Sequence, residues 1–238
     1  MSKPEKLHWP ADLIALVPLY NHGQTVAQVI AWCQALGAPT VLVIDDGSTD
    51  NGAQNAKRVG AIVRHLPGNH GKGAALRAGL TWAQGQGYLR AITIDADAQH
   101  PLEAIARMVY ASQRVPQAFL LGKRRMHQAP WTSRLGRVLT GFATLLLTGR
   151  HIRDNQSGLR VLPIASVLNF KSRAKGYAWE PEIIVEALWR GHQVQEVSVP
   201  VVYDLKRVSH FCSVRDTVKT GAVFGRLALL PKTCVCSK

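Results

Sequence analysis

Apolar runs alternate with amphipathic stretches through the first half of the chain. The apolar runs are short and rich in Val, Ile and Leu, as is typical of buried strands, and they lie at residues 13–20, at the start of 40–50, and at 61–66, 90–97 and 118–124. Between them, apolar positions recur every three or four residues, which predicts helices at 24–37, 71–87 and 101–113. Strands that alternate with such helices predict an α/β fold, with a mainly parallel central sheet covered by helices on both faces.

The C-terminal third is more irregular. Residues 176–191 have helical spacing, residues 194–203 have the pattern of a strand, and residues 214–231 form another helical stretch with a net positive charge. There is no internal repeat and no low-complexity linker. We therefore expect an N-terminal tail at 1–11, one α/β domain at 12–205, and a basic, membrane-associating segment at 206–238.

Polar side chains follow three of the predicted strands. Asn21 follows the first strand, Asp45 and Asp46 close the second, and Asp95 and Asp97 close the fourth. In a parallel α/β sheet, ligands bind outside the carboxyl ends of the strands. The sequence therefore predicts that these side chains converge on a binding site at one edge of the sheet.

The segment from Asp95 to Gln99 has the residue types of a metal site. In an extended chain, Asp95, Asp97 and Gln99 point the same way, and three oxygen ligands suit a hard cation such as Mg²⁺ or Mn²⁺. The alternative is that the carboxylates cap the helix that begins near Pro101.

Two further motifs lie near the same predicted edge. In residues 45–50, DDGSTD, Ser48 and Asp50 suit a tight turn, while the Asp45–Asp46 pair suits hydrogen bonds to a ribose or a base. Residues 68–79, GNHGKGAALRAG, resemble a phosphate-binding loop but do not match the P-loop pattern. Their glycines permit a tight entry into a helix and Lys72 adds a positive charge, although a purely structural turn is the alternative.

The charge balance favours anionic partners. The chain has 29 Lys and Arg against 15 Asp and Glu, a formal net charge of +14, so nucleic acid, an anionic membrane surface and phosphorylated substrates are all compatible. Aromatic residues make up only 7%, and the acidic motifs would repel a nucleic-acid backbone, so nucleic acid is not an expected partner.

A long basic stretch points to a membrane. From Leu121 to Arg153 there are seven Lys or Arg residues and no Asp or Glu, and within it apolar residues recur at helical spacing. They are Leu135, Val138, Leu139, Phe142, Leu145 and Leu146. Such a helix either lies in a membrane interface or faces the core with a solvated basic edge, and both alternatives stay open.

The termini and cysteines suggest a cytoplasmic protein. The N-terminus is polar, and the longest apolar block, 141–149, is shorter than the ~20 residues that span a bilayer. Cys33 suits a core position, whereas Cys234 and Cys236 suit a loose tail of reduced thiols. We expect a cytoplasmic protein held peripherally at the inner face of the membrane.

The ordered set of motifs carries a family resemblance. VPLYN (17–21), VIDDGSTD (43–50), NHGKGAALRAG (69–79), DADAQHP (95–101) and DNQSGLRVLP (154–163) together resemble the family 2 glycosyltransferases. The resemblance covers roughly residues 12–205 and is strongest to dolichyl-phosphate mannosyltransferase and to bacterial polyprenyl-phosphate or lipid-linked sugar transferases. It implies the GT-A fold, a Rossmann-like α/β/α arrangement.

The resemblance also implies a donor site. An inverting transfer from a UDP- or GDP-sugar is implied, with Mg²⁺ or Mn²⁺ held by Asp95, Asp97 and Gln99, of which Asp97 also ranks as catalytic. The residues implied to contact the nucleotide sugar are Pro18, Tyr20, Asn21, Asp45, Asp46, Lys72, Asp95 and Ala96. One departure is His22, which stands where the family usually has Glu.

On the acceptor side, the resemblance matches Asp154 to a catalytic acidic residue and Arg160 to a basic residue near phosphate. The residues implied to contact an acceptor or its phosphate are Arg124, Arg160, Trp179, Glu180, Ser209 and His210, with Arg207 in the last segment. Helix capping is the alternative for Glu180. Asp154 would take the proton of a hydroxyl acceptor, whereas arginines would position a lipid phosphate, and both acceptors stay open.

Three other functions compete with this interpretation. A sugar nucleotidyltransferase would need a Gly-rich basic loop after the first strand, which PLYNHGQT does not supply. A nucleic-acid-binding protein is suggested only by the positive net charge. A catalytically inactive membrane scaffold would not need Asp95, Asp97 and Asp154 together.

Overall fold

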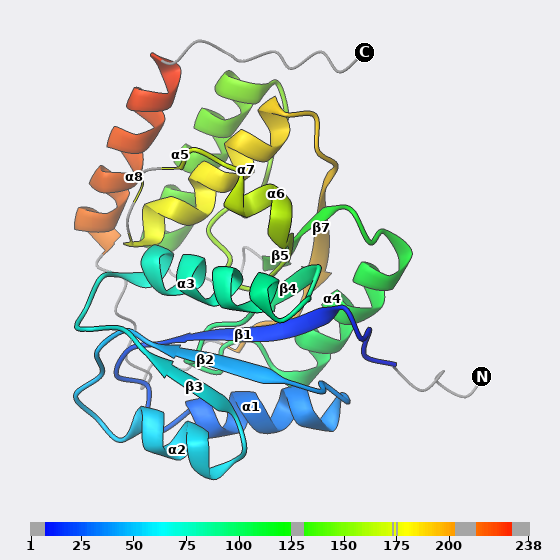
Figure 1. The fold of residues 1–238 in the computed structure, drawn as a ribbon. Coiled ribbons are helices and arrows are strands. Elements are labelled where there is room, and N and C mark those ends of the chain that lie inside the picture. The colour runs from blue at the N-terminus through cyan, green and yellow to red at the C-terminus, as the bar shows by residue number, and fades with distance from the viewer. Residues whose placement is uncertain (1–7, 125–130, 173, 175, 203–212, 230–238) are drawn as a thin grey trace.

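The computed structural model describes residues 8–124, 131–172, 174, 176–202 and 213–229, and within these ranges the side chains of 131–135 and 213–219 are left undescribed. The seven strands form one sheet in the order β3-β2-β1-β4-β6-β5-β7 (Figure 1). Their bounds are β1 Leu13–Leu19, β2 Val41–Asp45, β3 Ile62–His65, β4 Arg90–Thr93, β5 Phe119–Arg124, β6 Arg160–Pro163 and β7 Val194–Val199. All neighbours pair in parallel except β6, which runs antiparallel to β4 and β5. The predicted α/β class with a mainly parallel sheet is confirmed.

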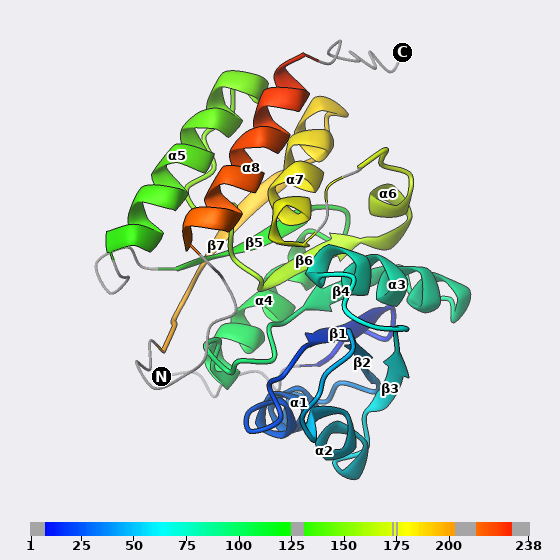
Figure 2. The same ribbon diagram turned by 90° about the vertical axis from the view of Figure 1, so that its left-hand side faces the viewer.

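Two helical layers enclose the sheet (Figures 1 and 2). On one face lie α1 Val26–Ala35, α2 Gly52–Arg58 and α4 Leu102–Arg114, and on the other lie α3 Lys72–Gly85, α6 Ile164–Leu168 and α7 Trp179–Trp189. Alternate residues of β1 enter opposite cores: Leu13 and Ala15 pack with α1, whereas Ile14 and Leu16 pack with α3. Because both faces of the central strands are covered, these strands appear as continuous apolar runs in the sequence.

The strand order brings three loops to one edge. The chain proceeds from β1 outward through β2 to β3, and then β4 pairs with the other side of β1, so the direction of winding reverses between β1 and β4. Such a reversal opens a crevice at the carboxyl ends of the strands. Since β6 is antiparallel, its first residue, Arg160, pairs with Thr93 at the end of β4. The turn that precedes β6 therefore lies at the same edge as the segments that follow β1, β2 and β4.

The structure departs from the predicted elements at several points. The strand predicted at 90–97 ends at Thr93, and Ala96–Asp97 form a turn that continues into Ala98, whose φ is +56°. The elements α2, α6 and β6 were not predicted, because each is short and β6 lies within a stretch that was interpreted only as a motif.

An outer pair of helices covers part of α7. Helix α5, Trp131–Thr148, and helix α8, Ser213–Ala228, pack against each other and against α7 through a small cluster that includes Phe224 and Leu227. Within the described residues, no helix is both long and apolar enough to cross a bilayer.

The buried side of α5 is polar, contrary to one of the two alternatives for this stretch. Arg137, Thr140 and Thr144 are buried, whereas Val138, Leu139, Phe142 and Leu146 are exposed. The alternative in which this apolar stripe faces the core is therefore wrong.

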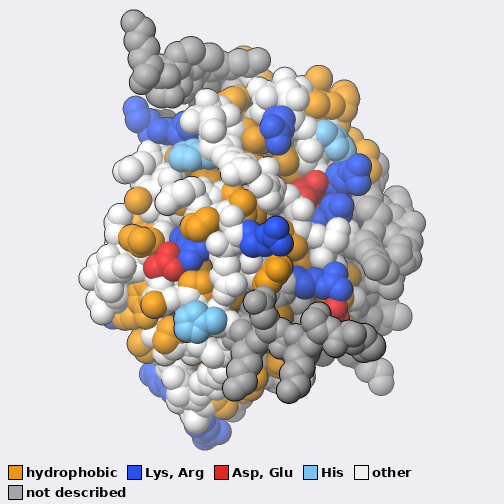
Figure 3. All heavy atoms as spheres, turned by 90° about the vertical axis from the view of Figure 1, so that its right-hand side faces the viewer, with side chains coloured by type: hydrophobic (Ala, Val, Ile, Leu, Met, Phe, Trp, Pro, Cys, Tyr) orange, Lys and Arg blue, Asp and Glu red, His pale blue; other side chains and the backbone are white. Residues whose placement is uncertain are grey.

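The face of the molecule shown in Figure 3 has no single concentrated basic patch. On the face shown in Figure 3, Lys and Arg side chains lie among neutral and hydrophobic side chains and do not form one continuous stripe. A continuous basic stripe with interleaved aromatics is typical of nucleic-acid-binding surfaces. This face therefore gives no support to nucleic acid as a partner.

Asp12 and Arg90 form an ion pair at the other end of the sheet, and it gives a first prediction. Arg90 is buried and donates to both carboxylate oxygens of Asp12, at 2.7 and 2.6 Å, and to the carbonyl of Ser112. Hydrogen bonds from Arg90 hold the pKa of Asp12 below its ordinary value, although burial opposes them. We expect Asp12→Asn to lower the free energy of unfolding at pH 7 by about 1–2 kcal/mol, because the pair is charge-assisted but partly exposed on the Asp12 side.

The pH dependence of this effect has a definite sign. A carboxyl whose pKa is lowered by folding contributes stability above its unfolded pKa, and this stability is lost as the pH falls through the folded pKa. The difference between wild type and Asp12→Asn in urea unfolding should therefore shrink below about pH 4. Glu103→Gln, at an exposed i,i+4 pair with Arg107, is the matched control and should cost a few tenths of a kcal/mol. A difference between wild type and Asp12→Asn that does not change with pH would contradict this assignment.

Candidate active site

The loops after β1 and β2 are cross-linked to each other. Asn21, whose φ is +52°, donates its backbone N–H to Ser48 Oγ, and its side-chain oxygen accepts from the backbone of Thr49 at 2.8 Å. Asp50 accepts from the backbone N–H groups of Gly23 and Gly52. The predicted turn role of Ser48 and Asp50 is confirmed, and Asn21 serves the same turn. Pro18 and Tyr20 lie half-buried at the end of β1, next to this loop.

Asp45 and Asp46 are both buried and both fix neighbouring chain segments. Asp45 accepts from the backbone of Ser48 at 3.0 Å and contacts His65 Nδ1 at 2.9 Å. The two oxygens of Asp46 accept the backbone N–H groups of His70 and Gly71, at 2.8 and 2.7 Å. Asp46 therefore holds the 69–71 loop, whereas Asp45 holds the turn at Ser48 and contacts β3, and the contact of either carboxylate with a nucleotide stays a prediction.

The 69–71 loop delivers Lys72 into the site. Gly71, with φ +87°, precedes the first residue of α3, as the glycine pattern predicts. A Cβ on the next glycine, Gly73, would lie 2.6 Å from Trp179 Cβ, so only glycine lets α3 begin this close to α7. The sequence motif thus encodes close packing as well as a turn.

Lys72 joins two carboxylates from different segments. Its Nζ lies 2.6 Å from Asp95 Oδ1 and 3.0 Å from Glu180 Oε2. Burial would lower the pKa of Lys72, but the two carboxylates outweigh burial and raise it, so the ammonium is charged at neutral pH. Burial would raise the pKa of Asp95, but Lys72 holds it below its ordinary value. Lys72 therefore neutralises Asp95 from inside the protein.

Asp97 is in a different electrostatic state from Asp95. Burial, and then the neighbouring Asp95 carboxylate, raise the pKa of Asp97 to about 6. Its Oδ1 accepts the backbone N–H of Gln99 at 3.0 Å, and the turn at Ala98 replaces the extended geometry that was expected to align Asp95, Asp97 and Gln99. Pro101 precedes α4 with no side-chain cap, so the alternative in which these carboxylates cap that helix is wrong.

The pair of carboxylates suits a cation that is shared with a substrate. No cluster of three or more His, Cys, Asp or Glu side chains is found in the described part of the chain. Mg²⁺ and Mn²⁺ sites in phosphate-transferring enzymes commonly use one or two carboxylates and complete their shell with substrate phosphates and water. Because Asp97 carries the negative charge that the protein neutralises least, a cation fits best at Asp97.

Gly158 packs against the carboxylate of Asp95, a contact that sequence reasoning missed. A Cβ at position 158 would overlap all three atoms of the Asp95 carboxylate. Thr93 Oγ1 donates to the carbonyl of Gly158 at 2.9 Å, which fixes this backbone against the end of β4. The glycine lies in the DNQSGLRVLP motif, so its presence there was the available signal.

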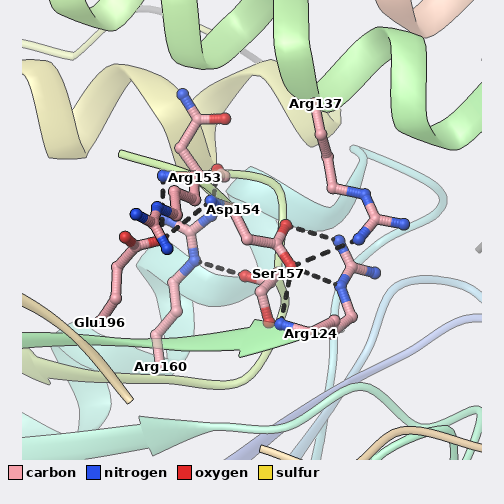
Figure 4. Close-up of polar contacts among 8 residues, drawn as sticks. Arg124, Arg137, Arg153, Asp154, Ser157, Arg160 and Glu196 are labelled. Carbon is pink, nitrogen blue, oxygen red and sulfur yellow. Dashed lines mark hydrogen bonds and ion pairs between the residues drawn. The ribbon is translucent and has the colours of Figure 1, made fainter. Parts of the chain in front are cut away.

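Arg124, Arg137 and Asp154 form a second charged cluster, drawn in Figure 4. Arg124 at the end of β5 donates to both oxygens of Asp154, at 2.8 and 2.9 Å, and its backbone N–H donates to the same carboxylate. Arg137 points from α5 toward this pair, 3.7 Å from Asp154. Glu196 of β7 accepts the backbone N–H groups of Arg153 and Asp154, which holds the turn in place.

These contacts make Asp154 a poor base. The carboxylate is almost completely buried, and burial would raise its pKa, but Arg124 outweighs burial and holds the pKa below its ordinary value. A general base works best when its pKa is near the working pH. Asp154 is thus better suited to positioning Arg124 and Arg137 than to removing a proton.

Arg160 and Trp179, predicted as acceptor contacts, lie in the interior behind the site, and their contact with an acceptor stays a prediction. Arg160 is buried and donates to the backbone carbonyls of Ser157, Glu180 and Asn155, each at 2.7 Å. Trp179 lies in the core beneath α3. Both residues support the site from the protein interior: Arg160 holds the 155–158 turn, and Trp179 packs against Gly73.

Glu180 lies between these groups. Its carboxylate is buried, with Oε2 beside Lys72 and Oε1 3.6 Å from Arg160. Glu180 lies in the first turn of α7, where a carboxylate suits the helix dipole, although the helix has no side-chain cap hydrogen bond. Glu180 therefore links the Lys72–Asp95 pair to the turn that carries Asp154.

His100 is another residue that sequence reasoning did not assign. It is buried, and burial followed by the nearby Arg124 charge lowers its pKa to about 4, so it is neutral at pH 7. Its Nδ1 has no hydrogen-bond partner within the described residues.

The remaining predicted residues lie beside or beyond these clusters. Buried Ala96 follows Asp95, and its carbonyl accepts from Thr25 Oγ1 at 2.6 Å. The carbonyl of His22 accepts the backbone N–H of Val26 at the start of α1. Arg207, Ser209 and His210 lie outside the described residues, as do Cys234 and Cys236.

The sequence as a whole matches a known family. A family model described as "Glycosyl transferase family 2" matches residues 14–167, which span β1 to α6 and include Lys72, Asp95, Asp97, Arg124, Arg137 and Asp154. The chain belongs to glycosyltransferase family 2. It is therefore a glycosyltransferase, and the predicted resemblance is confirmed, whereas the nucleotidyltransferase and the two non-enzyme alternatives are set aside.

Two relatives of this glycosyltransferase have curated names. The UDP-N-acetylglucosamine–dolichyl-phosphate N-acetylglucosaminyltransferase of Methanococcus voltae is 28% identical over 240 residues, covering 90% of this chain and 94% of that protein. The undecaprenyl-phosphate 4-deoxy-4-formamido-L-arabinose transferase of Pseudomonas paraeruginosa is 34% identical over 145 residues, covering 53% of this chain. The match covers only 41% of the second protein's length.

Solved structures share the fold of this glycosyltransferase. Glucosyl-3-phosphoglycerate synthase from Mycobacterium tuberculosis, solved in complex with Mn²⁺, UDP-glucose and phosphoglyceric acid, aligns with a TM-score of 0.74 at 19% identity. The alignment covers 93% of this chain and 81% of that one. The predicted GT-A fold is thereby confirmed.

Proposed function

We propose that this glycosyltransferase moves a sugar from a UDP- or GDP-sugar to a lipid phosphate, with inversion at the anomeric carbon and with Mg²⁺ or Mn²⁺ bound. The observation that carries the proposal is the state of Asp154, a buried carboxylate held by Arg124 with its pKa lowered. A hydroxyl acceptor needs a base to remove its proton, whereas a phosphate acceptor is already anionic and needs cations to position it. Two arginines around a carboxylate that cannot serve as a base fit the second acceptor.

The names of the two relatives support the same acceptor class. One relative is named for dolichyl phosphate and the other for undecaprenyl phosphate, and both are therefore named for polyprenyl phosphates. Their names alone do not establish which sugar or which lipid this chain uses. Together with the arginine pair they favour a phosphate at the end of an isoprenoid lipid.

On the donor side, the chain supplies two carboxylates and one ammonium group. Asp97, with Asp95 beside it, would hold the cation, and Gln99 stays a predicted third ligand. A divalent cation supplies charge neutralisation for a departing diphosphate when it is bound. One solved structure of the same fold contains Mn²⁺ and UDP-glucose, which supports a donor and cation of this kind.

The chain's own residues would then align the reaction. Asp46 holds the loop that delivers Lys72, and Lys72 fixes Asp95 at the edge where the diphosphate would lie. Arg124 and Arg137 would hold the acceptor phosphate, so that one of its oxygens forms the new bond to the anomeric carbon as the bond to the diphosphate breaks. Attack from the face opposite the leaving group inverts the configuration. Lys72 and the two arginines offset negative charge on both sides of the reacting carbon.

The testing experiment is a calorimetric titration of UDP and of GDP, each with and without Mn²⁺, into wild type and Asp97→Asn. We expect one nucleotide to bind in the presence of Mn²⁺, and we expect Asp97→Asn to weaken that binding at least about tenfold, because a neutral amide is a poor ligand for a hard cation. Glu186→Gln on α7, at an ion pair with Arg190, is the matched control and should bind like wild type.

The acceptor is tested with the matching sugar nucleotide. Transfer should occur to a polyprenyl phosphate and not to the corresponding polyprenol. Equal rates to both acceptors would refute the phosphate assignment. Nucleotide binding that ignores both Mn²⁺ and the change at Asp97 would refute the donor site.

A further inference from the structure

Helix α5 buries its polar side, whereas an ordinary surface helix buries its apolar side. Arg137, Thr140 and Thr144, which repeat at intervals of three and four, are buried, and Asn155 donates to both the carbonyl of Thr140 and Thr144 Oγ1. Gly141 faces the same way, since a Cβ there would lie 2.7 Å from the carbonyl oxygen of Ile152. The polar side of this helix is therefore its inner side, and it forms one wall of the cluster around Asp154.

The opposite side of α5 is apolar and open. Val138, Leu139, Phe142 and Leu146 share one arc of the helix and are 50–65% exposed. We call these four residues the α5 stripe. Along the helix axis the stripe is about 12 Å long. Exposed apolar residues are ordinary when they are scattered, but a contiguous arc of large ones is typical of an interaction surface.

We propose that the α5 stripe inserts into the surface of an anionic lipid bilayer. The inference rests on the proposed function, since it identifies where the acceptor lipid meets this enzyme. The helix would lie in the plane of the interface with the stripe among the upper acyl chains, which is how amphipathic helices bind peripherally. No described helix crosses a membrane in this arrangement.

Charge selects a bilayer over other partners. The whole protein carries +14, and the stretch from Leu121 to Arg153 contains no Asp or Glu. Arg150, His151 and Arg153 are exposed just beyond the C-terminal end of α5. Apolar side chains flanked by basic ones match a surface of acyl chains beneath anionic headgroups. A second copy of this chain would present the same positive charge and be repelled.

The position of the stripe also suits the acceptor. The inner side of the same helix supplies Arg137, 3.7 Å from Asp154 and next to Arg124. A helix with its side chains is about 10 Å across, so a phosphate held by these arginines would lie about one helix diameter from the stripe. A lipid phosphate could then reach the site while its isoprenoid chain stays in the bilayer.

The experiment compares three forms of the full chain in co-sedimentation with vesicles. The vesicles contain either phosphatidylcholine alone or phosphatidylcholine with phosphatidylglycerol. The test variant is Phe142→Gln with Leu146→Gln, which changes only exposed side chains. The matched control is Leu89→Gln with Tyr110→Gln, which removes two large exposed apolar side chains from elsewhere on the surface. Sedimentation velocity on each form reports self-association.

We expect wild type and the control to bind the anionic vesicles, and the test variant to bind them at least about tenfold more weakly, since two inserted side chains are lost. All three forms should bind UDP or GDP equally. Equal vesicle binding by the test variant and wild type would overturn the proposal. So would a wild-type dimer that the test variant converts to a monomer, because the stripe would then be a protein interface.

A failure of the proposed acceptor would give different results from a failure of the membrane proposal. If wild type transfers no sugar to a polyprenyl phosphate while vesicle binding still depends on the stripe, the acceptor is wrong and the membrane surface stands. If transfer to a short, water-soluble isoprenyl phosphate is normal in the test variant and vesicle binding is unchanged, the acceptor stands and the stripe has no membrane role.

Discussion

Gly158→Ala is expected to reduce sugar transfer at least about a hundredfold, because a displacement of a catalytic group by about 1 Å can cost that much. The added methyl group would occupy the position of the Asp95 carboxylate, and Thr93 fixes the Gly158 backbone so that the turn cannot retreat. Asp95 would be pushed away from Lys72 and from its neighbour Asp97. Steady-state rates and the Mn²⁺-dependent titration of the nucleotide would measure both consequences.

Gly85→Ala supplies the control for this prediction. Gly85 ends α3, and a Cβ there meets nothing within 4 Å. Its replacement should leave transfer unchanged and alter stability by no more than about 1 kcal/mol. Wild-type transfer by a folded Gly158→Ala protein would show that the position of Asp95 is not critical.

Arg124→Met is expected to lower the free energy of unfolding by about 3 kcal/mol and to reduce transfer about a hundredfold. The substitution removes both side-chain hydrogen bonds to Asp154 and leaves that carboxylate buried, with Arg137 at 3.7 Å. Loss of transfer follows because one of the two arginines proposed to hold the acceptor phosphate is gone. Urea unfolding and initial rates measure the two effects.

The pH dependence of the free energy of unfolding tests whether the stability loss in Arg124→Met comes from Asp154. In wild type the pKa of Asp154 is lowered, so the pair contributes stability above the unfolded pKa and loses it as the pH falls through the folded pKa. Without Arg124, burial raises that pKa, and the buried carboxyl accepts a proton more readily. The stability difference from wild type should therefore begin to narrow above pH 4, as the variant's Asp154 takes up a proton, and should narrow further below about pH 4, where wild type loses its own contribution.

A double variant tests whether stability and function have different causes. Arg124→Met with Asp154→Leu replaces the hydrogen-bonded Arg124–Asp154 pair by apolar side chains, which is often neutral for stability, but it also removes the carboxylate that lies 3.7 Å from buried Arg137. We expect part of the stability to return while transfer stays low. Recovery of transfer in the double variant would mean that the arginine serves only to neutralise Asp154.

The sequence predicted the sheet well because its strands are buried on both faces. Continuous apolar runs such as Leu13–Leu19 leave few alternatives, and the turn residues that follow them mark the strand ends. Strand β6 was missed for a physical reason. Its four residues derive their strand geometry from pairing with β4 and β5 on either side, and the local sequence does not encode that pairing.

The sequence identified several residues of the site, but it did not predict which side chains they contact. Asp46, Lys72, Asp95 and Asp154 do converge at one edge, because topology alone brings strand ends together. Their partners depend on contacts across long stretches of sequence: Lys72 meets Glu180, and Arg124 meets Asp154. Such contacts surround Asp154, the candidate base for a hydroxyl acceptor, with arginine side chains, and no single-sequence pattern contains them.

The helix α5 shows the limit of periodicity. Its apolar stripe was visible in the sequence, and both a core and a membrane were compatible with it. What rules out the core is that Thr140 and Thr144 face inward and accept hydrogen bonds from Asn155, which only folding brings against this helix. The equally periodic polar residues Arg137, Thr140 and Thr144 were the available signal for an inward-facing polar side.

The Arg124–Asp154 pair joins the two ends of a long excursion of the chain, the segment from Arg124 through α5 to Asp154. The backbone leaves the sheet at Arg124, passes through α5 and returns at Asp154, and the two ends are joined by hydrogen bonds of 2.8 and 2.9 Å. Under the proposed function this excursion carries part of the acceptor site, and it contains none of Asp46, Lys72 and Asp95. Chimeras that exchange it with that of a relative would need a matched pair at this junction and matched contacts of α5 with α7 and α8, and they offer a route to enzymes that glycosylate new lipids.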